Sequence, residues 1–194
     1  SSEYKLPVLD IESMANVDVK EDYKFTYVKG CNFNLLFNKL KGQIYSWNYE
    51  GVDILKEGPK LNFWRAPIDN DMYIVKEWRK KGLDILHHRI DEVETTIEDK
   101  LAIVNIKTFI SPPNGDWALE CRYIYKIYGS GHVDMSIVGS PKGNIPGTLP
   151  KIGLQMKLPK FMSRVKWYGR GPGESYIDSK EANPFGVYKS TVDE

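Results

Sequence analysis

The sequence predicts an all-β fold of antiparallel strands with one short helix. Aromatic residues make up 12% of the 194 residues, and β-branched residues recur in short runs bounded by Gly, Pro, Asn and Asp. Every second residue from Leu119 to Ile127 is apolar or aromatic, while Glu120, Arg122 and Lys126 lie between them. Alternation with a period of two is typical of a strand with one buried face. Composition and periodicity therefore both favour strands.

The N-terminal third predicts a hairpin followed by a second turn. Residues 1–20 contain scattered apolar positions and predict either a bridging segment or an edge strand. Strands are expected at 32–37 and 43–49, because Gly42 between them can adopt the left-handed conformation of a short hairpin loop. The dipeptide Glu50-Gly51 predicts a turn into another strand at 52–55.

One helix is expected at Asp71–Leu83. Ile74, Val75 and Trp78 fall on one side of it, charged residues fall on the other, and Gly82 supplies an end. Later, 93–97 and 102–106 alternate on either side of Asp99-Lys100, which predicts an antiparallel hairpin. Further strands are expected at 132–138, 152–158 and 164–168.

Two segments carry turn residues instead of a periodic pattern. Segment 58–71 contains prolines at 59 and 67, and segment 169–186 contains glycines at 169, 171, 173 and 186. We expect both to be irregular, and ordered loops often carry function.

Composition excludes several classes of protein. The formal net charge is +1 and the basic residues are dispersed, which argues against nucleic acid as a partner. No apolar run approaches the roughly 18 residues of a membrane helix, and no secretion signal is visible. Cys31 and Cys121 have no metal-site spacing, and adjacent His87 and His88 on a strand face opposite ways. We therefore expect no metal site, no membrane contact and a cytoplasmic location.

The first candidate site is the segment 62–71. Trp64 offers a flat face to a sugar ring, and Arg65, Asp69, Asn70 and Asp71 offer hydrogen bonds to hydroxyls. The alternative is structural, in which Arg65 is buried against Asp69 or Asp71 and fixes the loop to the sheet.

The second candidate site is the segment 167–178, which carries Trp167, Arg170 and Glu174. Its glycines do not match a phosphate-binding loop, and Pro172 removes a backbone N–H that would bind an anion. Glu174 and Asp178 could in principle form a carboxylate pair for glycoside hydrolysis, but 26 acidic residues offer many such pairs. Read from its residues alone, the chain shows no catalytic centre.

The two loops and their flanking motifs, in this order, make the chain identifiable as a relative of one family. From about Lys29 to Glu194 it resembles the C-terminal, fifth and small-chain, β-sandwich domain of glycoside hydrolase family 2 β-galactosidases. The motifs are Asn32-Phe33-Asn34-Leu35, Leu40-Lys41-Gly42, Trp47-Asn48-Tyr49, Leu55 to Pro59, Asn62 to Asp71, Trp78 to Gly82, Pro150 to Leu154, Trp167 to Tyr176 and Gly186-Val187-Tyr188.

This resemblance implies a fold and a role. The fold would be an antiparallel supersandwich like that of galactose mutarotase, spanning residues 23–194 and truncated at its C-terminus. Residues 1–22 would end a preceding immunoglobulin-like domain and linker. The catalytic glutamates of the family lie in a barrel domain outside this chain, so the fragment would be inactive. It would brace that barrel and shape the substrate entrance of an enzyme that hydrolyses terminal β-D-galactosides with retention.

The resemblance also implies partners and cofactors. The partners would be the other domains of the polypeptide, the β-galactoside substrate and a second copy in a homo-oligomer. The fragment itself would hold no cofactor, whereas the whole enzyme would use Mg and Na. Tyr176-Ile177-Asp178-Ser179 departs from the usual Tyr-Pro-Asp-Arg of the family. Two alternatives remain open, a stand-alone galactose-binding module using both loops and a purely structural domain.

Overall fold

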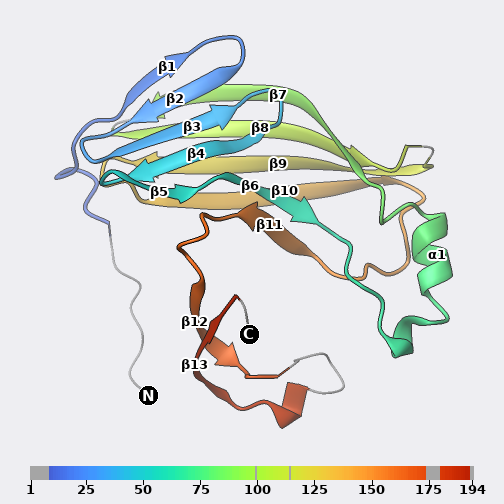
Figure 1. Ribbon diagram of the computed structural model, residues 1–194. Coiled ribbons are helices and arrows are strands. Elements are labelled where there is room, and N and C mark those ends of the chain that lie inside the picture. The colour runs from blue at the N-terminus through green and yellow to red at the C-terminus, as the bar shows by residue number, and fades with distance from the viewer. Residues whose placement is uncertain (1–8, 99, 114, 174–179, 193–194) are drawn as a thin grey trace. The chain divides into compact units, whose positions relative to one another are not determined.

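The computed structural model describes residues 9–98, 100–113, 115–173 and 180–192, and it is built mainly of antiparallel strands (Figure 1). The chain divides into two compact units, Ser1–Lys157 and Leu158–Glu194. The all-β prediction with one short helix is confirmed.

The first unit contains a seven-stranded antiparallel sheet. Its order is β1-β2-β3-β4-β6-β11, and β5 pairs with β4. The strands are β1 (Asp18–Glu21), β2 (Phe25–Lys29), β3 (Phe33–Asn38), β4 (Gln43–Tyr49), β5 (Val52–Leu55), β6 (Glu57–Asn62) and β11 (Gly153–Lys157). The hairpin predicted around Gly42 is confirmed, with φ of 61° at that glycine. Of the two alternatives for the lead-in, the edge strand is present as β1, which pairs with β2.

A second sheet of four long strands has the order β10-β9-β8-β7. Its strands are β7 (His87–Glu98), β8 (Leu101–Ser111), β9 (Trp117–Tyr128) and β10 (Val133–Gly143). Ile97 pairs with Ala102 across the turn, which confirms the predicted hairpin. In β9 the residues Cys121, Tyr123, Tyr125 and Ile127 are buried, as their alternation predicts.

The two sheets form the layers of a sandwich, and the core lies between them (Figure 1). Phe37 of β3 packs edge-on against Tyr125 of β9, with ring centroids 5.0 Å apart. The fully buried side chains come from both sheets and include Val28, Phe33, Leu35, Ile44, Val104, Ile106, Ile110 and Ile127.

The predicted helix is shorter than 71–83. A 3-10 turn, η1 (Asp69–Asp71), precedes α1 (Val75–Lys80). The helix ends in a Schellman motif, in which Gly82 has φ of 68° and the Leu83 N–H donates to the Trp78 carbonyl at 3.1 Å. Trp78 and Leu83 are both buried, so this end of the helix is fixed to the core.

The expectation of irregular structure across 58–71 is wrong for its first five residues, which belong to β6. Glu57 pairs with Lys157 and Lys60 with Gln155, so Gly58 and Pro59 oppose a single residue of β11. This is a bulge, where a proline is tolerated because its missing N–H interrupts no regular ladder.

The second unit contains the antiparallel pair β12 (Arg164–Arg170) and β13 (Phe185–Thr191), with η2 (Lys180–Ala182) between them. These strands take in both ends of the segment 169–186, which we expected to be irregular throughout. Trp167 lies opposite Tyr188 in the register.

Candidate functional site

Arg65 fixes the first loop through a two-pronged ion pair with Asp71. Its Nη1 donates to Asp71 Oδ2 at 2.5 Å and its Nη2 donates to Asp71 Oδ1 at 2.9 Å. Its Nε donates to the carbonyl of Pro150 at 3.0 Å. The guanidinium therefore joins the loop to a segment 85 residues away in sequence. This is the structural alternative for Arg65, with Asp71 as the carboxylate.

Asp71 is held in its ionised form. Its Oδ2 also accepts the backbone N–H of Ile68 at 2.9 Å, which closes the loop on itself. Hydrogen bonds from Arg65 and then from Ile68 lower the pKa of this carboxyl. Because the group remains an anion with its acceptor atoms engaged, it is poorly suited to donate a proton.

Two tryptophans pack against each other at this loop, and one of them, Trp78, lies under the guanidinium. The rings of Trp64 and Trp78 meet edge-on with centroids 6.5 Å apart, and Arg65 Cζ lies 5.5 Å from the Trp78 centroid. Trp78 Nε1 donates to Thr148 Oγ1 at 3.1 Å. Trp78 is buried, and Trp64 is partly buried against the core. Trp64 therefore offers less than a full ring face to a ligand.

The exposed part of this loop flanks Asp71, the carboxylate of the anchor. Asp69 and Asn70 are exposed, and Met72 and Tyr73 follow them with 61% and 87% of their surface accessible. We call these four residues the exposed rim. A carboxylate, an amide and a phenol ring are groups that bind sugar hydroxyls and the C–H face of a sugar.

Sequence reasoning missed Met72 and Tyr73 as site residues, although a signal was available. Both lie off the apolar side of the predicted helix, a pattern that predicts exposed side chains, although in the structure they precede α1. Thr148 and Pro150 were also missed as partners of this loop, because the residues that they contact lie about 70 and 85 residues away in sequence.

The second loop is built around Arg170. Its Nη1 donates to the carbonyl of Asn183 at 3.2 Å, and its Nη2 donates to Glu181 Oε1 at 3.4 Å. Trp167 Nε1 donates to the Arg170 carbonyl at 3.2 Å, and its ring packs on Tyr188 at 5.5 Å. Trp167 and Arg170 thus lie together and connect the two ends of the loop.

Glu174, the remaining candidate of the second loop, lies outside the described residues, as does Asp178. The structure groups the other candidates in two sets, one in each unit. Trp64, Arg65 and Asp71 come together in the first unit, with Asp69 and Asn70 exposed beside them. Trp167 and Arg170 come together in the second unit.

Among the described residues, no three His, Cys, Asp or Glu side chains gather as metal ligands would. His87 is exposed and His88 is partly buried, as expected for neighbours on a strand. In the same described part, no helix has the length and apolar character needed to cross a bilayer.

Comparison with known proteins decides the family. The sequence model of one protein family, the beta galactosidase small chain, matches residues 29–194. The chain belongs to this family. Its resemblance to the β-galactosidase small chain, read from the motifs of both loops, is therefore confirmed.

Curated relatives of this small-chain protein are β-galactosidases. That of Lactobacillus delbrueckii subsp. bulgaricus is 33% identical over 97% of this chain and 18% of its own length. That of Priestia megaterium is 31% identical over 86% of this chain and 16% of its own length. That of Kluyveromyces lactis is 30% identical over 89% of this chain and 17% of its own length. The chain thus spans less than a fifth of the relatives that it matches.

Proposed function

We propose that this chain is a non-catalytic domain of a larger β-galactosidase that hydrolyses terminal β-D-galactosides with retention. The observation that carries the proposal is the match to the small-chain family together with its share of 16–18% of the relatives. The proposed enzyme works in the cytoplasm as a homo-oligomer and uses Mg and Na bound by the whole polypeptide.

The chemistry of the described loops supports a non-catalytic role. Retaining hydrolysis uses two carboxyl groups about 5 Å apart, one of which must carry a proton at the start of the reaction. Asp71 is held as an anion by Arg65 and Ile68, and Asp69 is solvent-exposed. Catalysis is therefore assigned to carboxyl groups in another part of the enzyme.

The role proposed for the first loop is to shape the substrate entrance. Arg65 ties the loop to Pro150 and Trp78 is buried in the core of the sandwich, while the rim residues beside them are exposed. A rigid base and a polar and aromatic tip suit a wall that meets a sugar without taking part in bond cleavage. The sandwich beneath it would brace the catalytic barrel.

The test compares two proteins against one chromogenic β-galactoside. The full-length protein that carries this chain should hydrolyse it, and NMR should show β-galactose as the first-formed anomer. The chain produced alone should give no rate above buffer. Activity of the isolated chain would refute the assignment of catalysis to another part of the polypeptide. An inactive full-length protein would refute the β-galactosidase assignment.

A second candidate function is a stand-alone galactose-binding module. It is favoured by the 87% exposure of Tyr73 beside Asp69 and Asn70, which gives an open ring next to hydrogen-bonding groups. Titration calorimetry of the chain with galactose should then show saturable binding that Tyr73→Ala abolishes. The absence of binding heat at millimolar galactose would reject this candidate. The same titration with Trp64→Ala tests whether the partly buried ring of Trp64 contributes to binding.

A further inference from the structure

The strand β11 ends the seven-stranded sheet, and its apolar side chains are incompletely covered. It pairs with β6 on one side, and no strand in the described part of the chain pairs with its other side. Leu154 and Met156 of β11 are 44% and 47% exposed. An edge strand with bare N–H and C=O groups and exposed apolar side chains is a template for a further strand.

These two side chains lie on the core face of the sheet. Leu154 is opposite Leu61 in the register, and paired residues of antiparallel strands project to the same side. Leu61 is buried in the core of the sandwich. Met156 follows Leu154 by two residues on a strand, so it projects the same way. The core face therefore continues to β11, where its last apolar side chains are only half covered.

The four-stranded sheet ends along the same side of the sandwich. Tyr123 of β9 and Leu61 of β6 are joined between the sheets, since Tyr123 Oη accepts the Leu61 N–H at 3.0 Å. One strand further out, Ile137 of β10 lies opposite Tyr123. In the other sheet, Leu154 of β11 lies opposite Leu61. Both β10 and β11 are terminal strands, and Figure 1 shows them along the same side.

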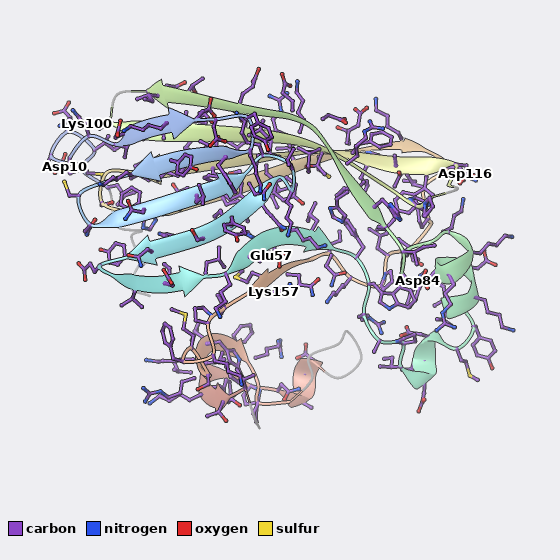
Figure 2. The ribbon with its side chains drawn as sticks, turned by 45° about the horizontal axis from the view of Figure 1, so that its top comes forward. Asp10, Glu57, Asp84, Lys100, Asp116 and Lys157 are labelled. Atoms are coloured by element: carbon purple, nitrogen blue, oxygen red, sulfur yellow. The ribbon has the colours of Figure 1, made fainter. Side chains whose placement is uncertain are left out.

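The other face of β11 is polar and already paired. Lys157 Nζ donates to Glu57 Oε2 at 2.5 Å, and Gln43 Nε2 donates to Glu57 Oε1 at 3.1 Å. Figure 2 shows Glu57 and Lys157 side by side on β6 and β11. A segment that covers the edge of β11 therefore needs apolar side chains toward the core and can be polar on its other face.

The remaining edges of the first unit carry features that discourage a further strand. Three of the four residues of β1 are charged. The edge strand β7 has a bulge between Ile90 and Glu92, and β10 contains Pro141, which has no N–H to donate. By contrast, β11 has no proline, and its single charged residue, Lys157, points away from the core face. Among these four edges, β11 is the one suited to pairing.

We propose that a β-strand from a part of the same polypeptide outside this chain pairs with the free edge of β11 and covers Leu154 and Met156. Main-chain hydrogen bonds would hold this strand, and its alternate side chains, facing the core, would be apolar. The curated relatives supply the residues for it, because the chain spans less than a fifth of their length. A covalently linked segment is present at high effective concentration, which favours it over a second copy.

Hydrogen exchange followed by mass spectrometry tests the pairing in the full-length protein, without any substitution. In a free edge strand roughly half of the amides point away from the neighbouring strand and exchange rapidly. In a covered strand all of them are bonded. We therefore expect every amide in residues 153–157 to exchange slowly. Rapid exchange of about half of them would overturn the proposal.

A cross-linker at position 156 identifies what covers the edge. Benzoylphenylalanine placed there in the full-length protein should, on illumination, form a bond to residues outside 1–194 within one polypeptide. Peptide mass spectrometry locates the bond, and gel electrophoresis shows whether one or two chains are joined. A cross-linked dimer, a bond only to residues 158–194, or no cross-link would each overturn the proposal.

Two matched variants test which face of β11 is covered. Leu154→Asp places a charge on the core face, and Gln155→Asp places the same charge on the other face. Leu154→Asp should speed exchange in residues 153–157 about tenfold and remove the cross-link, because a carboxylate is costly between apolar side chains. Gln155→Asp should preserve both signals. Equal effects of the two variants would overturn the proposal.

The inference rests on the proposed larger polypeptide and is independent of its hydrolytic activity. The two can therefore fail separately. A full-length protein that forms the cross-link but does not hydrolyse a β-galactoside would refute the proposed function and support the pairing at β11. An active protein with a freely exchanging β11 would do the reverse.

Discussion

Replacement of Tyr125 by Phe should stabilise the sandwich, although it removes a polar atom from the centre of the core. Tyr125 is 1% exposed, and its Oη has no hydrogen-bond partner among the described residues. Burial strongly raises the pKa of this phenol, so it stays neutral. An unpaired buried hydroxyl costs about 1–3 kcal/mol, because the unfolded chain would hydrate it. Removing one oxygen leaves a small void that costs about 0.4 kcal/mol. The expected net gain is about 1 kcal/mol, or roughly a fivefold change in the opening equilibrium.

Tyr123→Phe is the matched control, two residues away on the same inward face of β9. Here the hydroxyl accepts the Leu61 N–H at 3.0 Å, and its loss leaves a buried backbone donor unpaired. This variant should destabilise by about 1–3 kcal/mol. The same chemical change therefore has opposite signs at two neighbouring positions.

Native-state hydrogen exchange of the β8 and β9 amides measures both effects, and it does so within the full-length protein. Tyr125→Phe should slow the exchange of the most protected amides about fivefold, and Tyr123→Phe should speed it. If Tyr125→Phe speeds exchange as much as Tyr123→Phe, the Tyr125 hydroxyl has a favourable partner and the reasoning is refuted.

Three further predictions concern the helix end, the loop anchor and pH. Gly82→Ala should destabilise the unit by about 1 kcal/mol or more, because φ is 68° and a Cβ would meet Pro112 at 2.6 Å; an unchanged melting temperature would contradict this. Asp71→Asn should remove the ion pair with Arg65 and make segment 62–72 more sensitive to limited proteolysis, whereas equal cleavage of wild type and variant would show that the ion pair does not hold the loop. For wild-type Asp71 the lowered pKa means that its stabilising effect is full above the unfolded value near 4 and is lost as pH falls through the folded value. For His88 the pKa is lowered to about 4, so its contribution is full above about 6.5 and is lost as pH falls toward 4; NMR titration of its ring protons should show a midpoint near 4, and one near 6.5 would show an exposed imidazole.

Local sequence patterns predicted the strands that alternate apolar and polar residues and pair with a neighbour in sequence. The two-residue period predicted the buried faces of β8 and β9. Ala102, Val104 and Ile106 are buried in β8, as are Tyr123 and Tyr125 in β9, whereas Ile97 of β7 is 55% exposed. The strand β6 was missed for the opposite reason. Pro59 reads as a breaker, yet it sits in a bulge that exists only because β11 pairs with β6 from about 95 residues further along the chain.

The candidate site was likewise predicted only in part. The residue types in segment 62–71 were sufficient to expect an arginine–carboxylate pair, but not to choose between Asp69 and Asp71. That choice depends on the 3-10 turn, which brings Asp71 Oδ2 back to the Ile68 N–H and beside Arg65. The unpaired hydroxyl of Thr108 had no sequence signal, because a threonine in an inward-facing row resembles any other strand residue until its contacts within the described part of the chain are known.

Both candidate loops use their arginine in the same way, and this changes where a ligand should be sought. Arg65 donates to the carbonyls of Pro150 and Ala66, and Arg170 donates to the Asn183 carbonyl, so each guanidinium satisfies backbone acceptors. A donor already engaged by the protein would have to give up those bonds to reach a sugar hydroxyl. The groups available for recognition are therefore those that the anchors leave exposed. In the first unit the most exposed such group is the ring of Tyr73, so Tyr73→Ala should weaken sugar binding more than Arg65→Ala or Trp64→Ala.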